Sequence, residues 1–244
     1  MTRRARLLVG AVAAALGALL LLPTPRPEAL PGSAAASTLG PLRPMVATVL
    51  RLRFEARRRD STVAGQLDDA WRALALVPEN AADFATFAAW FLFDAPALAR
   101  SAAEREACVR AGFELLAAGR RLHPRFARLD FLEAIALQSF ARQAPERLAW
   151  APLPSGTGAT AHAFALLVRA HRQAAASPAP RSQQERELIA AALASAVAEL
   201  LRDDATPAAL RAEAAACADR LAEEEALSAE WRALLHDARS AERE

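Results

Sequence analysis

Apolar residues recur at three- and four-residue steps along most of the chain after Pro44, which is the spacing of one face of an α-helix. The series are Met45, Val49, Leu52 and Ala56; Leu67, Ala70, Trp71 and Leu74; Phe84, Phe87, Ala88 and Phe91; Cys108, Ala111, Leu115 and Leu122; and Phe126, Leu129, Ala136 and Phe140. No run alternates apolar and polar residues as a half-buried strand does, and β-branched residues are few. The pattern predicts an all-α fold.

Prolines, glycines and capping residues divide these series into helices. Val77-Pro78, His123-Pro124 and Pro145 end three of the helices, while Asn80 or Asp83 opens the third helix and Ser101 the fourth. Residues 145–158 hold three prolines and two glycines, so we predict a loop between one helical region over 45–144 and a second over 159–244. The second region is predicted to hold four helices, over 160–176, 182–202, about 206–225 and from Ser228 onward.

The first 22 residues differ from the rest of the chain. Three arginines precede sixteen uncharged and nearly all apolar residues, Leu7 to Leu22, which would span about 24 Å as a helix. The run is somewhat shorter than a hydrocarbon core of about 30 Å, but it exceeds the usual 7–15-residue core of a signal peptide. The small residues Ala34 to Ala36 lie more than ten residues beyond it. Residues 1–22 are therefore predicted as an uncleaved signal anchor, a single transmembrane helix. Cleavage near Ala36, giving a secreted or periplasmic protein, is the alternative.

Basic side chains predict the orientation of this anchor. Arg3, Arg4 and Arg6 precede it, and only Arg26 lies in the fifteen residues that follow Leu22. Since basic flanks stay in the cytoplasm, the N-terminus is predicted inside and the C-terminal domain outside the cytoplasmic (inner) membrane. Residues 23–44, rich in Pro, Ala, Ser and Gly, are predicted to form an extended tether.

Charge narrows the choice of partners. The net charge of the 244-residue chain is +2, but residues 1–60 carry ten arginines against three acids, and the remainder carries twenty against twenty-five. An acidic body without interleaved aromatic and basic residues excludes nucleic acid as a partner. The run from Arg51 to Arg59 is predicted to be a solvated helix face, with contact to anionic headgroups as the alternative. The alanine-rich, lysine-free composition favours helices and indicates a bacterial, high-GC source.

The stretch from Ala70 to Asn80 resembles the closing helix of a tetratricopeptide repeat, with Ala73 and Pro78 on two of the pattern's positions. A weaker copy ends at His123-Pro124, which places the two prolines forty-six residues apart. The resemblance covers residues 46–140. It implies antiparallel helix pairs stacked as a short TPR-like solenoid, with an irregular bundle as the alternative.

The sequence contains no recognisable motif of catalytic or metal-binding residues. The chain has no His-Glu-x-x-His and no Cys-x-x-Cys, and its helical acid pairs point about 100° apart. His162 and His171 are nine residues apart, which puts them on opposite faces of one helix. We therefore predict no catalytic residue, no cofactor and no metal. Cys108 and Cys217 are expected to be small buried residues, and a disulfide between them is the alternative.

The aromatic residues Phe84, Phe87, Trp90, Phe91 and Phe93 form the richest apolar cluster outside the anchor. Core packing is the simplest interpretation, and a groove for a partner's helix, lined by Trp90 and Phe93, is the alternative. The sequence favours a non-enzymatic, membrane-tethered, extracytoplasmic scaffold or adaptor for an unknown protein partner. The alternatives are an exported helical domain that binds a small apolar ligand, and an enzyme with unrecognised residues.

Overall fold

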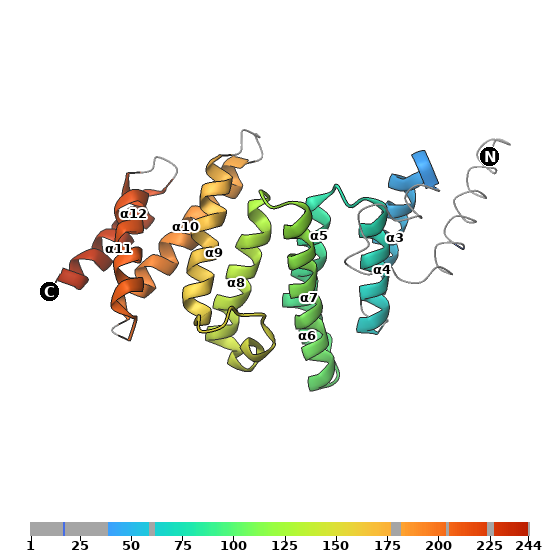
Figure 1. Ribbon diagram of the computed structural model, residues 1–244, viewed down its shortest axis with the longest axis horizontal. Coiled ribbons are helices and arrows are strands. Elements are labelled where there is room, and N and C mark those ends of the chain that lie inside the picture. Colours follow the sequence, from blue (N-terminus) through green and yellow to red (C-terminus); the bar gives the residue numbers. More distant parts are fainter. Residues whose placement is uncertain are drawn as a thin grey trace. The chain divides into compact units, whose positions relative to one another are not determined.

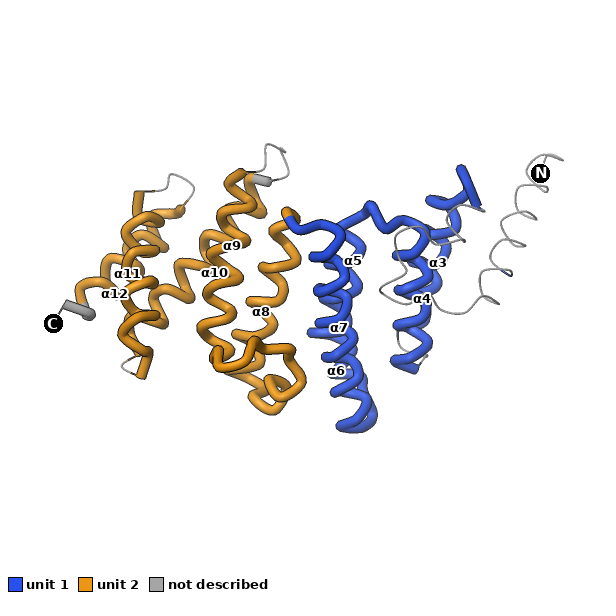
Figure 2. The backbone as a smooth tube through the Cα atoms, in the orientation of Figure 1, with its two compact units in different colours: residues 1–124 blue, residues 125–244 orange. Residues whose placement is uncertain are grey.

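The computed structural model describes residue 17 and residues 39–58, 62–176, 182–203, 205–223 and 227–243. Within these ranges every regular element is a helix, so the predicted all-α class is confirmed for them (Figure 1). The chain forms two compact units, the first ending at Pro124 and the second beginning at Arg125 (Figure 2).

The first unit consists of paired helices. Its elements are the 3-10 helix η2 (Gly40–Leu42), α3 (Arg43–Arg57), α4 (Val63–Leu76), α5 (Ala81–Ala89), the π-helix η3 (Trp90–Asp94), α6 (Ala95–Leu98) and α7 (Ala102–Leu122). Helix α3 packs on α4, and α7 packs on α5, η3 and α6. Ser101 opens α7 as predicted, because its hydroxyl accepts a hydrogen bond from the backbone N–H of Glu104 at 3.1 Å.

Helical structure begins earlier than predicted. Residues Gly40 to Pro44, assigned to the end of the tether, form η2 and the first turn of α3. Pro41 and Pro44 do not prevent this, since each occupies the first turn of its helix, where a backbone N–H has no partner within the helix.

The predicted apolar face of α3 is wrong. Met45 and Leu52 are 45% and 63% exposed, whereas the neighbouring series Val46, Ala47, Leu50 and Phe54 is buried. Both series have helical spacing, but only the buried one carries an aromatic ring. Phe54 packs edge-on against Phe87, with ring centroids 4.8 Å apart, and burial of this large side chain fixes the rotation of the helix.

The other predicted series do supply the core. Phe84, Phe87, Ala88 and Phe91 are all buried, as the core interpretation of the aromatic cluster requires. In the next helix Cys108, Ala111 and Leu115 are buried as well.

The π-helix η3 lies against α7 at a glycine. A Cβ atom added to Gly112 would lie 2.6 Å from Cγ and 3.2 Å from the backbone nitrogen of Leu92. Any side chain at this position would therefore push η3 away from α7.

The two predicted proline turns share one backbone conformation. Val77 before Pro78 has φ −133° and ψ 60°, and His123 before Pro124 has φ −129° and ψ 63°. The helices that follow open at Asn80 (φ −91°, ψ 88°) and at Phe126 (φ −90°, ψ 95°). Proline disfavours helical geometry in the residue before it, so each turn ends its helix at the same place. The two prolines that lie forty-six residues apart in the sequence are thus each part of a turn with the same backbone conformation.

The second unit is made of longer helices. Its elements are α8 (Ala127–Gln143), the 3-10 helix η4 (Pro145–Trp150), α9 (Ala159–Ala175), α10 (Ser182–Arg202), α11 (Ala208–Ala222) and α12 (Ala229–Arg243). Helix α9 packs on α8 and on α10, and α10 also packs on α11 and α12. Alanines at Ala163, Ala170 and Ala174 allow the close approach of α9 to its neighbours. The segment 145–158, predicted as a loop, contains η4 and lies within this unit.

No helix within the described ranges is long and apolar enough to cross a membrane. The predicted signal anchor, residues 1–22, falls outside those ranges except for Gly17, and residues 23–38 of the tether, with the cleavage site near Ala36, fall outside them entirely.

Candidate functional site

Trp90 lies where α5 gives way to the π-helix, and its side chain is only 7% exposed. Its indole Nε1–H donates a hydrogen bond to Oε1 of Gln66 at 3.0 Å. The amide of Gln66 in turn donates to the backbone carbonyl of Arg58 at 3.2 Å. These bonds satisfy the polar atom of a buried tryptophan, so Trp90 belongs to the core of the first unit.

Arg58 covers one face of Trp90. Its guanidinium carbon lies 4.4 Å from the centre of the indole and 5.6 Å from the centre of the Phe54 ring, which is cation–π geometry. Arg58 also pairs with Glu55. Phe93, the second residue predicted to line a partner groove, is half-buried three residues further along η3.

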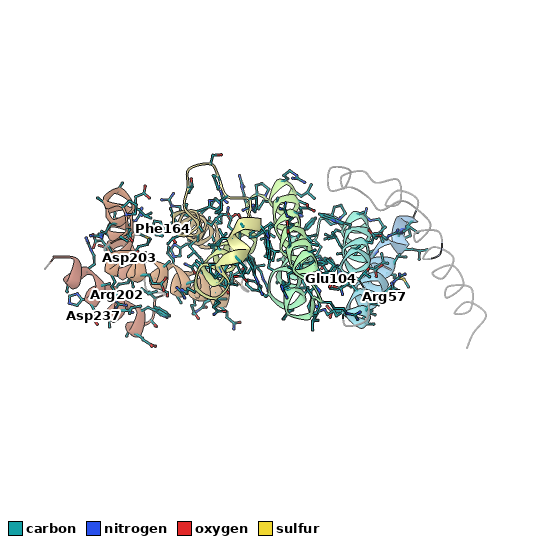
Figure 3. All side chains as sticks on the ribbon, turned by 90° about the horizontal axis from the view of Figure 1, so that it is seen from below. Arg57, Glu104, Phe164, Arg202, Asp203 and Asp237 are labelled. Carbon is teal, nitrogen blue, oxygen red and sulfur yellow. The ribbon has the colours of Figure 1, made fainter. Side chains whose placement is uncertain are left out.

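A pocket of about 140 Å³ opens beside this stack, and we call it the Trp90 pocket. The residues that matter for its chemistry are Arg58, Val63, Trp90, Leu98, Arg100 and Glu104. Glu104 stands in the first turn of α7 (Figure 3), where its carboxylate accepts a hydrogen bond from the backbone N–H of Arg100 at 2.6 Å. Phe93 does not line this pocket.

The arginines of the basic run that α3 carries, predicted to be a solvated face, make ion pairs with acids of the first unit. Arg53 and Arg57 approach the buried carboxylate of Asp69 at 3.2 and 3.7 Å, and Arg51 pairs with Asp83. These partners could not be predicted from the sequence of α3, because the acids come from α4 and α5. Burial raises the pKa of Asp83, and the charge of Arg51 opposes that rise.

Two buried acids of α8 face polar residues of α9 in the second unit. Asp130 accepts hydrogen bonds from Nε and Nη2 of Arg169 at 2.5 and 2.6 Å, which raises the pKa of that guanidinium. Glu133 lies 3.3 Å from Nε2 of His162. Sequence reasoning missed both acids. A usable signal existed, since Glu133 interrupts the apolar series Leu129, Ala136 and Phe140 at a core-facing position.

The remaining titratable residues that the structure describes do not converge on one site. Nε2 of His123 contacts the carbonyl of Pro78 at 2.7 Å and links the end of α7 to the first proline turn. Cys108 and Cys217 are both buried. In the part of the chain that the structure describes, no group of three or more His, Cys, Asp or Glu side chains could hold a metal ion.

A groove of about 640 Å³ runs between α10 and α12, and we call it the α10–α12 groove. Its apolar floor includes Leu188, which is 56% exposed, together with Leu227 and the half-buried Trp231. Glu187 of α10 and Arg232 of α12 also line it. Leu188 and Trp231 are forty-three residues apart in the sequence, and packing of α12 on α10 brings them together.

A second pocket in this unit, of about 290 Å³, is bounded by α8, α9 and α10, and we call it the Phe164 pocket. Leu137, Phe164 and Leu200 give it apolar walls. The ion pair between Arg142 and Glu199, together with Asp203, adds polar atoms to its lining; Phe164 and Asp203 are labelled in Figure 3.

Comparisons of the chain with protein-family models, with curated proteins and with solved structures found no match.

Proposed function

We propose that this protein is a non-enzymatic, membrane-tethered scaffold whose extracytoplasmic helices bind an amphipathic helix of a partner protein in the α10–α12 groove. The observation that carries the proposal is the apolar floor of that groove, where Leu188 and Trp231 remain open to solvent. A leucine that is more than half exposed, beside a half-buried tryptophan, forms an apolar surface suited to contact with a partner.

The size and lining of the groove favour a helix as the occupant. A helix presents apolar residues at three- and four-residue steps, and such a stripe fits an apolar groove between two helices. Glu187 on the α10 wall and Arg232 on the α12 wall carry opposite charges. A fitting partner helix carries basic residues on the side facing α10 and acidic residues on the side facing α12.

The helix pairs and the repeated proline turn support the scaffold role. Stacked pairs of this kind form solenoids, which present extended surfaces for other proteins. The TPR-like solenoid remains part of the proposal and rests on the shared geometry of the turns at Val77-Pro78 and His123-Pro124.

Site-specific photo-crosslinking in native membranes tests this function. A crosslinker at position 188 of the full-length protein should capture one partner of constant mass, and Leu188→Glu should abolish its co-purification. Leu52→Glu is the matched control, because Leu52 is 63% exposed and belongs to the first unit. Equal recovery of the partner by wild type and Leu188→Glu would refute the groove as its binding site.

The tether has its own test. Alkaline extraction should leave the protein in the membrane pellet, and N-terminal sequencing should find residue 1 or 2. A mature N-terminus near Ser37 would replace the anchored protein with a secreted one.

The Phe164 pocket favours a second candidate function, the binding of a small apolar ligand. Its volume of about 290 Å³ is near the lower limit for ligand pockets. Native mass spectrometry of the freshly purified protein should then show an adduct of constant mass. Ala196→Leu, which fills the pocket wall, should remove the adduct.

A further inference from the structure

The Trp90 pocket is lined by two arginine side chains and by a few apolar residues. Arg58 and Arg100 line it together with a single acid, Glu104, so the lining carries one net positive charge. The exposed Arg100 side chain makes no ion pair with any described residue. The guanidinium of Arg58 lines the pocket where it is stacked on the indole of Trp90 and paired with Glu55. Donors of this kind are suited to a carboxylate or another oxyanion.

The size of the pocket limits the ligand. Its volume is about 140 Å³, and an apolar cavity of about 150 Å³ accepts a molecule the size of benzene, with six carbon atoms. Val63 and Leu98 supply apolar surface beside the arginines. The ligand that matches this lining is therefore small, singly charged and partly apolar.

We propose that the Trp90 pocket binds a short-chain monocarboxylate of about six non-hydrogen atoms, such as a four-carbon acid. The carboxylate lies between the guanidinium groups of Arg58 and Arg100, and the alkyl chain lies against Val63 and Leu98. The single net charge disfavours a phosphate dianion, because Glu104 stands in the same lining. This site lies in the first unit and is independent of the proposed partner groove in the second.

The indole of Trp90 reports on the pocket directly, because its N–H bonds to Gln66 at the pocket wall. The experiment uses full-length protein labelled with ¹⁵N-tryptophan, with Trp90→Phe to assign the resonance among the four indole signals. Titration with butyrate should shift the Trp90 resonance to saturation. Butyramide, which has the same shape without the charge, should bind at least about tenfold more weakly, as for the loss of a charged hydrogen bond.

Two variants test whether Arg100 itself binds the carboxylate. Arg100→Gln removes an exposed side chain and should weaken butyrate binding about tenfold without unfolding the protein. Arg121→Gln is the control, since it removes the same charge from an exposed position at the other end of α7 and should leave binding unchanged.

Inorganic phosphate and acetate complete the set of probes. Both should bind more weakly than butyrate, phosphate because of its charge and acetate because of its short chain. Equal binding of butyrate and butyramide, or an unchanged affinity in Arg100→Gln, would overturn the proposal. A shift that grows linearly with butyrate concentration and never saturates would overturn it as well.

Discussion

Nε and Nη2 of Arg169 both donate hydrogen bonds to the carboxylate of Asp130, at 2.5 and 2.6 Å, across the interface of α8 and α9. The two partners are unequally buried: the side chain of Asp130 is 3% exposed and that of Arg169 is 53% exposed. Because only the carboxylate has been removed from water, loss of the arginine leaves a buried charge, whereas loss of the acid leaves a solvated one.

Removing Arg169 and removing Asp130 should therefore lower the free energy of unfolding by different amounts. We expect Arg169→Met to lower the free energy of unfolding by about 3 kcal/mol and Asp130→Ala by about 1 to 2 kcal/mol, measured by urea titration. Asp219→Ala is the control: its pair with Arg239 is a surface pair, with Asp219 62% exposed, and its loss should cost under about 1 kcal/mol. Equal costs for the two halves would contradict the asymmetry.

Gly112 should tolerate no side chain. Gly112→Ala places a Cβ 2.6 Å from Leu92 and should cost about 1 to 3 kcal/mol by overpacking. Gly65→Ala is the matched control on α4, because its Cβ would meet nothing closer than the Thr62 hydroxyl at 3.4 Å. That variant should be neutral or more stable by up to about 1 kcal/mol, since alanine favours the helix. Thermal unfolding of both variants checks the difference, and an equal loss in both would exclude the close packing of η3 on α7.

The rotation of α3 predicts opposite results for two residues two positions apart. Phe54→Ala removes a fully buried ring and should cost about 3 to 5 kcal/mol. Leu52→Ala, at a position 63% exposed, should change the stability by less than about 0.5 kcal/mol. Chemical denaturation of the two variants distinguishes the faces, and the reverse order would restore the face that the sequence predicted.

Asp83 should make the stability of the first unit depend on pH. Its pKa is raised above the ordinary value of 3.8 by burial, so the folded state holds this proton more tightly than the unfolded state does. The contribution of Asp83 is therefore most favourable below pH 3.8 and is lost as the pH rises through the folded pKa. Relative to Asp83→Asn, the wild type should lose stability over that window. Urea titrations of both proteins at several pH values measure the difference, and a difference that does not vary with pH would contradict the raised pKa.

Local sequence signals predicted the helices and several of their ends. The features that they did not predict depend on contacts between residues far apart in the sequence. The ends at Val77 and His123 could be read from the prolines that follow, because the restraint acts on the neighbouring residue alone. The face of α3 could not, since two series fit the helical period and the selection depends on aromatic rings of α5 and η3 that pack on Phe54, such as Phe87, thirty-three residues away. The π-helix at Trp90 has no period of its own to recognise over five residues.

The candidate sites, too, were only partly predictable from local sequence, because their contacts come from other helices. Trp90 was singled out by its neighbours in sequence, but its bond to Gln66 and its stacking with Arg58 depend on α3 and α4. Asp130 resembles a surface acid until α9 supplies Arg169. Leu188 and Trp231 share a groove only because α12 folds back onto α10.

The shared turn at Val77-Pro78 and His123-Pro124 has a consequence for how such a chain can change. The backbone of such a connector is restrained by a proline acting on the residue before it, so the same turn can follow helices of different sequence. Helices α4 and α7 differ in length and sequence, and both already end in this turn.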